Sequence, residues 1–257
     1  MQSLRFAAVA AFLLIPAGVA FADDAPPPPP DGIWTGKGQF GFLNSRGNSD
    51  AESINGNLDM ARIDGPWKNE LTIVGLYGQS AGIVSAERAT AVLQSNREIS
   101  GDLFGFGNLR YEHDLFDGFE YQASAAVGLG YKIFDTTDTK LVAQVGVGYR
   151  RLRPEDISKA PDGAVDGRTL LPATGAGIVT LQVDYSQALT ATTTLTNKFY
   201  METGPGDTLI HDNVAVAVKV SNKLALSVGY GVNDNTNPPG GLKKVDTTET
   251  VNLVYSF

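Results

Sequence analysis

The feature that most constrains this chain is a two-residue alternation of apolar side chains with small or polar ones. From Tyr121 to Tyr131 the odd positions are apolar and the even positions are small or polar, and residues 141–150 and 224–231 repeat the pattern. A period of two places the apolar side chains on one face of an extended strand, whereas a helix needs a period near 3.6. The sequence therefore predicts an all-β fold.

Turn-forming clusters separate the alternating segments. We predict about twelve strands from the spacing of these clusters, near residues 33–43, 51–63, 67–79, 86–98, 102–112, 119–133, 139–152, 169–186, 191–203, 208–220, 223–233 and 246–257. In the fifth strand Phe104 and Phe106 fall on one face, while Leu109 and Tyr111 fall on the other. This conflict predicts a bulge or a register irregularity in that strand.

The positions of the aromatic residues distinguish a membrane barrel from a soluble sandwich. Tyr121 and Tyr131 share a face and, on a strand tilted by about 40°, lie about 25 Å apart along the barrel axis, which is the height of the apolar band between two aromatic girdles. Other aromatic residues fall toward the same two ends: Trp34, Trp67 and Tyr255 at one, and Tyr77, Tyr149 and Tyr230 at the other. We predict an antiparallel up-and-down transmembrane β-barrel of the outer-membrane type.

The lengths of the connections give the predicted orientation. The long connections, residues 153–168 and 234–245, both fall at one end of a twelve-stranded barrel, and short turns such as residues 64–66 and 221–222 fall at the other. Outer-membrane barrels have long extracellular loops and short periplasmic turns. We therefore expect both termini in the periplasm of a Gram-negative bacterium.

The beginning of the chain predicts export. Arg5 precedes an apolar run over residues 6–15 that ends at Pro16, and small residues before Asp23 suit a signal peptidase, with Ala20, Ala22 and Asp23 forming the expected cleavage site. Five consecutive prolines follow at residues 26–30. We predict a signal peptide over residues 1–22, a proline-rich periplasmic tether over residues 23–32 and a barrel over residues 33–257.

The last segment predicts how the barrel is assembled. Val251, Leu253, Tyr255 and Phe257 alternate with other residues up to the end of the sequence. An apolar row that faces lipid, beside an open strand edge, is what a barrel presents to its assembly machinery before closure. The expected partners are therefore outer-membrane lipid and the export and barrel-assembly machinery.

Charge and composition exclude several functions. The 20 Lys and Arg residues against 28 Asp and Glu residues give a net charge of −8, which disfavours nucleic-acid binding. The sequence has no Cys, so it offers no disulfide, zinc-thiolate site or cysteine nucleophile. We expect no cofactor, and we expect a monomer.

The polar face of the predicted strands supplies the candidate site residues. They carry both charge signs and should line the lumen: Lys37, Gln39, Asn55, Asn57, Asp59, Glu70, Arg88, Gln94, Gln122, Lys132, Gln144, Arg150, Gln182, Asp184, Lys198, Glu202 and Lys219. Such groups can line a narrow aqueous path, or they can pair with one another and fill it. Mixed signs favour the paired interior, because unpaired charges in a narrow lumen lose hydration.

Catalytic and metal-binding motifs are weak. His113 and His211, each followed by Asp, fall near predicted strand ends at the outer rim, and no Ser has a distinctive motif beside them. A hydrolase needs nucleophile, base and orienting group together, so we expect no enzyme and no metal site. Acidic residues in the two long connections could attract divalent cations, but nothing fixes a ligand shell. These residues are Asp156, Asp162, Asp166 and Asp234.

Several local motifs resemble one family. They are Trp34-Thr35-Gly36, Phe40-Gly41-Phe42, Arg46-Gly47-Asn48-Ser49-Asp50, the segment Arg110 to Phe116 and Gly128-Leu129-Gly130-Tyr131. The mature chain resembles proteins described as salt-induced outer membrane proteins, also labelled domain-of-unknown-function family 481. The resemblance implies an outer-membrane location and a link to osmotic stress, and it supplies no catalytic residues.

Three functions follow as hypotheses. The first is an envelope or osmotic-stress barrel, or a narrow small-solute channel. The second is an outer-membrane hydrolase of lipid or peptide that uses His113 or His211 as its base. The third is a soluble periplasmic β-domain with a binding cleft.

Overall fold

The computed structural model describes residues 31–45, 51–114, 118–160, 165–238 and 242–257. Its regular elements are strands: β1 (Trp34–Ser45), β2 (Ala51–Asp64), β3 (Trp67–Ser80), β4 (Ile83–Ser100), β5 (Leu103–Asp114), β6 (Phe119–Asp135), β7 (Thr139–Lys159), β8 (Val165–Leu170), β9 (Thr174–Ala188), β10 (Thr193–Gly204), β11 (Asp207–Lys219), β12 (Leu224–Asn235) and β13 (Val245–Ser256). The described ranges include no helix long and apolar enough to cross a membrane. The predicted signal peptide, its cleavage site and the prolines of the tether lie outside these ranges.

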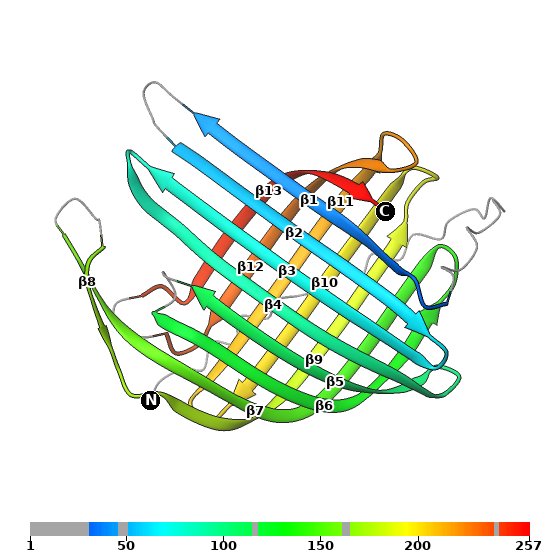
Figure 1. Ribbon diagram of the computed structural model, residues 1–257, viewed down its shortest axis with the longest axis horizontal. Coiled ribbons are helices and arrows are strands. Elements are labelled where there is room, and N and C mark those ends of the chain that lie inside the picture. Colours follow the sequence, from blue (N-terminus) through cyan, green and yellow to red (C-terminus); the bar gives the residue numbers. More distant parts are fainter. Residues whose placement is uncertain (1–30, 46–50, 115–117, 161–164, 239–241) are drawn as a thin grey trace, which may run out of the picture.

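Twelve of the strands form an antiparallel barrel (Figure 1). The hydrogen-bonded order runs β6-β5-β4-β3-β2-β1-β13-β12-β11-β10-β9-β7, and a β6–β7 pairing completes the ring. The predicted fold class, an all-β barrel of about twelve antiparallel strands, is confirmed. The first residue of β1, Trp34, and the last residue of β13, Ser256, lie at one end of the barrel. We call this the terminal end, and the opposite end is the distal end.

The predicted bounds of the eighth strand and of the long connection before it are wrong. In the described part of residues 153–168, β7 continues to Lys159 and pairs with β8, which extends past the distal end (Figure 1). The barrel strand itself starts later, at Thr174. The cause is backbone pairing, since peptide groups that leave the barrel wall still need partners; the Leu171 N–H donates to the Pro154 carbonyl at 2.9 Å. Asp156 and Asp166 belong to this hairpin, and Asp162 lies outside the described residues.

The predicted irregularity in β5 is found in its pairing with β4, which shifts between Glu98 and Ser100, opposite Phe104 and Leu103. Pairing with β6 is regular from Leu103 to Glu112 and shifts between Glu112 and Asp114. The two faces of β5 are both apolar near its start because Phe104 and Phe106 are buried in the lumen.

Glycines on neighbouring strands make room for these two rings. A Cβ at Gly130 would overlap the ring of Phe104, and a Cβ at Gly128 or Gly146 would come within 2.8 Å of the ring of Phe106. The rings therefore lie flat against the inner wall of β6 and β7. These three glycines of the lumen face leave room for the neighbouring aromatic side chains.

The barrel is apolar outside and polar inside, the reverse of a soluble protein. Its exposed large apolar residues occupy the outer positions of the strands, as Val127, Val147 and Val228 do, with tyrosines and tryptophans toward both ends. Many of its buried residues are polar or charged, including Gln144, Arg150, Glu155, Glu202, Glu112 and Asp114. The lumen is therefore where chemically active side chains gather.

Candidate functional site

The candidate site is the lumen. Every predicted lumen residue lies on the inner face of its strand in the observed register: Lys37, Gln39, Asn55, Asn57, Asp59, Glu70, Arg88, Gln94, Gln122, Lys132, Gln144, Arg150, Gln182, Asp184, Lys198, Glu202 and Lys219. The distal half carries arginines and the terminal half carries lysines, so the two halves differ in chemistry.

In the distal half, a set of charged and aromatic side chains packs across the lumen. We call it the distal network and define it as Arg88, Arg110, Glu112, Asp114, Arg150, Tyr200, Glu202, Asp207 and His211. β4, β5, β7, β10 and β11 supply these residues. They therefore come from walls that face each other, as well as from adjacent strands.

Arg150 is the most buried cation of the distal network. Its guanidinium lies 3.3 Å from Glu202 Oε1 and also pairs with Asp207. The Arg150 and Glu202 side chains are only 4% and 3% exposed. Charges this deeply buried are tolerated in proteins only when they are paired, so each charge of this cluster depends on its partner.

Arg110 reaches across the lumen from β5. Its guanidinium pairs with Glu112 on its own strand, and its Nη2 lies 3.4 Å from His211 Nε2 on β11. The same guanidinium sits 5.4 Å from the centre of the Tyr200 ring on β10, a cation–π distance. On the near wall, Arg88 pairs with Asp114 and lies 3.7 Å from Glu112. Arg110 thus bridges two opposite walls.

His211 was predicted to lie at the outer rim, but it is not exposed there. It lies well inside β11, with Nδ1 2.7 Å from Asn233 Oδ1 and its ring 6.2 Å from that of Tyr200. The Tyr200 hydroxyl donates to Glu202 at 2.8 Å. The prediction failed because the alternation of β11 turns the His211 ring into the lumen, where Arg110 and Tyr200 contact it.

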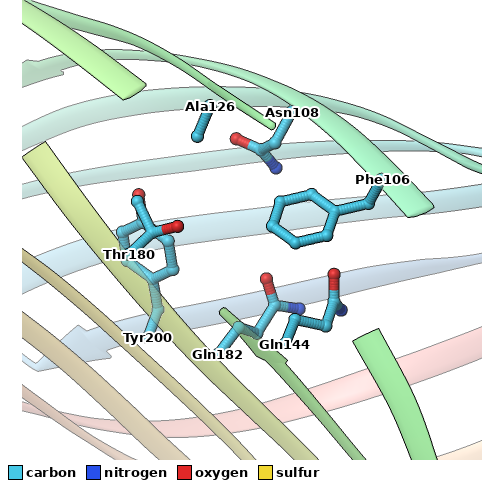
Figure 2. A pocket seen from close by; sticks show the side chains of 7 residues that line it. All are labelled: Phe106, Asn108, Ala126, Gln144, Thr180, Gln182 and Tyr200. Atoms are coloured by element: carbon cyan, nitrogen blue, oxygen red, sulfur yellow. The ribbon is translucent and has the colours of Figure 1, made fainter. Parts of the chain in front are cut away.

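Below the distal network lies a layer of carboxamides. Gln94 on β4 donates to Gln144 on β7 at 3.1 Å, and Asn108 donates to Gln94 at 3.2 Å. Figure 2 shows Asn108, Gln144 and Gln182 around a small cavity, with Phe106 and Tyr200 beside them. The cavity holds about 10 Å³, room for roughly one water molecule. A second cavity of the same size lies among Arg110, Arg150 and Tyr200.

The terminal half of the lumen is open to water. Lys198 lies on the inner face near the middle of β10, yet its side chain is 62% exposed, and its Nζ is 3.7 Å from Asp59 Oδ1, a group 26% exposed. Lys68 pairs with Glu70 at 2.6 Å. Exposure therefore falls steeply from Lys198 to Arg150, and the lumen is a chamber that is closed at its distal side.

The two histidines contact different groups. His113 Nδ1 contacts the Glu120 carbonyl at 2.5 Å, and the ring of His211 contacts Asn233, Arg110 and Tyr200. Within the ranges that the structure describes, no cluster of three or more metal-ligating side chains is present.

Four functional candidates were not predicted from the sequence: Arg110, Glu112, Tyr200 and Asp207. Arg110 and Glu112 share the inner face of β5 with Phe106. Strict alternation from Leu109 and Tyr111 would have found them, but the buried phenylalanines obscured the face. Tyr200 was missed because an inward aromatic side chain is unusual on a polar lumen face.

The model of a family described as protein of unknown function, DUF481, matches residues 38–257. Among individually curated proteins, no match is found.

Several solved barrels are similar in structure. An outer membrane channel from Pseudomonas putida F1 has a TM-score of 0.48 at 10% identity, covering 89% of this chain and 96% of that one. The NanC porin has a TM-score of 0.46 at 8% identity, covering 88% and 99%. The translocator domain of the autotransporter NalP from Neisseria meningitidis has a TM-score of 0.43 at 13% identity, covering 87% and 88%. These similarities concern the fold and not the function.

Proposed function

The chain belongs to the DUF481 family of proteins of unknown function, and from that premise we propose a function based on its barrel. The protein is an outer-membrane channel for small polar solutes, with both termini in the periplasm, and the distal network closes its axial path. A link to salt or osmotic stress remains a prediction from the family resemblance.

The membrane setting is supported by the outer surface. Val145, Val147, Val127 and Val251 are all more than half exposed, and water would not stabilise such a continuous apolar belt. Trp67 stacks under Arg97 at 5.4 Å and Tyr255 under Lys223 at 5.9 Å, both at the terminal end. Aromatic and basic side chains together suit the boundary between hydrocarbon and head groups. This surface also argues against a soluble periplasmic domain.

The channel role depends on one observation: the lumen changes from exposed to buried charges along its axis. Lys198 is hydrated, whereas Arg150 and Glu202 are not. A purely structural barrel has no need of a hydrated charged chamber, because apolar side chains would fill its interior at lower cost. A chamber that ends at paired charges suits a path that opens when those pairs separate.

Reconstitution into planar bilayers tests this function. We expect wild-type protein to give rare, small conductance steps, and Arg110→Ala to give frequent, larger ones, because Arg110 bridges the two walls. Lys140→Ala is the control, since Lys140 is exposed and lies 4.0 Å from Asp135 outside the distal network. If folded Arg110→Ala gives conductance steps no larger and no more frequent than those of the wild type, the channel proposal fails.

A further inference from the structure

The closure between β1 and β13 covers only part of the two strands. The register joins residues 37–40 of β1 to residues 253–256 of β13, and Gly36 and Phe257 exchange backbone hydrogen bonds of 3.1 and 3.0 Å. Pairing of β1 with β2 continues to the end of β1 at Ser45. In the described chain, no backbone pairing joins residues 42–45 of β1 to residues 245–251 of β13.

We call this unpaired stretch the seam. Figure 1 shows β1 and β13 close together near the C-terminus and diverging toward the end that carries β8. The pairing of β13 with β12, in contrast, runs on to Val245. Each strand of the seam therefore keeps one partner and leaves its other edge unpaired in the distal half of the barrel.

An unpaired strand edge is unstable in hydrocarbon, where each unsatisfied peptide group costs several kcal/mol. Part of the outer face beside the seam is polar, between the exposed apolar residues Val245 and Val251 of β13. Thr247 and Glu249 lie on the outer face of β13, in register with Val232 and Tyr230 of β12, and both are exposed. Polar groups are thus placed where the wall is open.

An inserted strand from a partner does not suit the seam. β1 and β13 are antiparallel, so one strand placed between them would run parallel to one of its two neighbours. All other neighbouring pairs in this sheet are antiparallel. A strand partner would thus break the pattern of the whole barrel, whereas an opening does not.

We infer that the seam is a lateral opening between the lumen and the outer part of the bilayer, and that it takes uncharged amphipathic molecules. The inference rests on the proposed membrane setting, and it does not require conduction along the axis. It gives the chamber a second route where the distal network closes the first.

The surfaces on either side of the seam define this ligand class. On the inner side, Asn55 Nδ2 donates to Asn252 Oδ1 at 2.6 Å across Gly41, whose missing side chain leaves room for both amides. On the outer side, Phe42 is 56% and Val251 is 68% exposed. A polar, uncharged head group can bond the amides while an alkyl chain contacts Phe42 and Val251. Glu249 at the outer edge disfavours an anionic head group.

Cysteine cross-linking tests whether the wall is open. The chain has no native Cys, so a double variant has no background. Phe40→Cys with Leu253→Cys joins two paired positions and should oxidise to a disulfide. Continuing the same register would put residue 44 opposite residue 249, and we expect Asn44→Cys with Glu249→Cys to stay reduced in lipid vesicles. Equal oxidation of the two pairs would mean that the seam is closed, and the inference would be wrong.

Photolabelling tests the ligand class. The probe is an alkyl glucoside that carries a diazirine on its alkyl chain, in vesicles of wild-type protein, with a diazirine fatty acid as the anionic counterpart. We expect the glucoside to label the region of Phe42 and Val251 more strongly than the region of Val145 on β7. The fatty acid should label these two regions to the same extent. If the glucoside labels the seam and the rest of the apolar outer belt equally, the seam makes only ordinary lipid contacts and the inference is wrong.

A variant of the inner amides completes the test. Asn55→Leu removes one amide, and loss of a hydrogen bond's net contribution should weaken seam labelling about tenfold. Asn197→Leu is the matched control, because Asn197 donates to Asp212 at 2.5 Å on the outer face of β10, away from the seam. Heat-modified gel mobility verifies folding of both variants. Unchanged labelling in folded Asn55→Leu would contradict the role of the amides, whatever the conductance of Arg110→Ala shows.

Discussion

Lys198 Nζ lies 3.7 Å from Asp59 Oδ1, although β10 and β2 stand almost opposite each other in the barrel. This ion pair spans the lumen where water still reaches it, since 62% of the Lys198 side chain is exposed. Surface-like pairs of this kind contribute little to stability, about 0–1 kcal/mol. Its position therefore says more about access to the lumen than about folding.

Access to the lumen should be one-sided. We expect Lys198→Cys to react with a membrane-impermeant, charged thiol reagent, and Glu202→Cys to be protected, because Glu202 is buried within the distal network. Mass spectrometry of the labelled protein in vesicles measures both. Rapid labelling of Cys at both positions would show a lumen open throughout, and protection of both would show one that is filled throughout.

The Arg150 cluster should dominate the stability of the lumen. Arg150→Met leaves Glu202 and Asp207 buried without their cation, which we expect to cost about 3–5 kcal/mol in the free energy of unfolding. Arg62→Met removes an exposed pair with Asp64 at 3.1 Å and should cost less than about 1 kcal/mol. Urea unfolding in lipid vesicles measures the difference, and equal losses would refute the packing described here.

The glycine beneath Phe104 should tolerate no side chain. Gly130→Ala places a Cβ against the ring, and overpacking of this kind costs about 1–3 kcal/mol. Phe104→Ala should restore much of that loss in the double variant. Gly107→Ala is the control, because a Cβ there meets nothing within 4 Å. Additive losses in the double variant would contradict direct contact between residues 104 and 130.

The terminal aromatic residue should matter more for assembly than for the finished barrel. Phe257→Ala keeps the backbone hydrogen bonds to Gly36, so we expect the purified variant to refold in detergent and its yield in the outer membrane to fall. Phe42→Ala, another exposed phenylalanine of the outer face, serves as the comparison. An undiminished membrane yield of Phe257→Ala would remove the predicted assembly signal.

Much of the fold was predictable because alternation is a local property. Tyr121 to Tyr131 shows its two faces without reference to any other strand, and the turn at residues 64–66 ends one strand regardless of its neighbours. Inner positions such as Lys198 and Gln144 follow from the same parity. The error at residues 153–170 arose because a hairpin outside the barrel has no membrane-facing side to mark it.

The sequence by itself determined that the chain is a ribbon with one apolar face, because each residue's face depends only on its position in a strand. Tertiary structure alone decided that Arg110 meets Tyr200 and His211, that Arg150 is buried while Lys198 is hydrated, and that β1 and β13 separate beyond Phe40. Those relationships depend on the shear and closure of the sheet, which bring together residues far apart in the chain. No local pattern encodes the distance across a lumen.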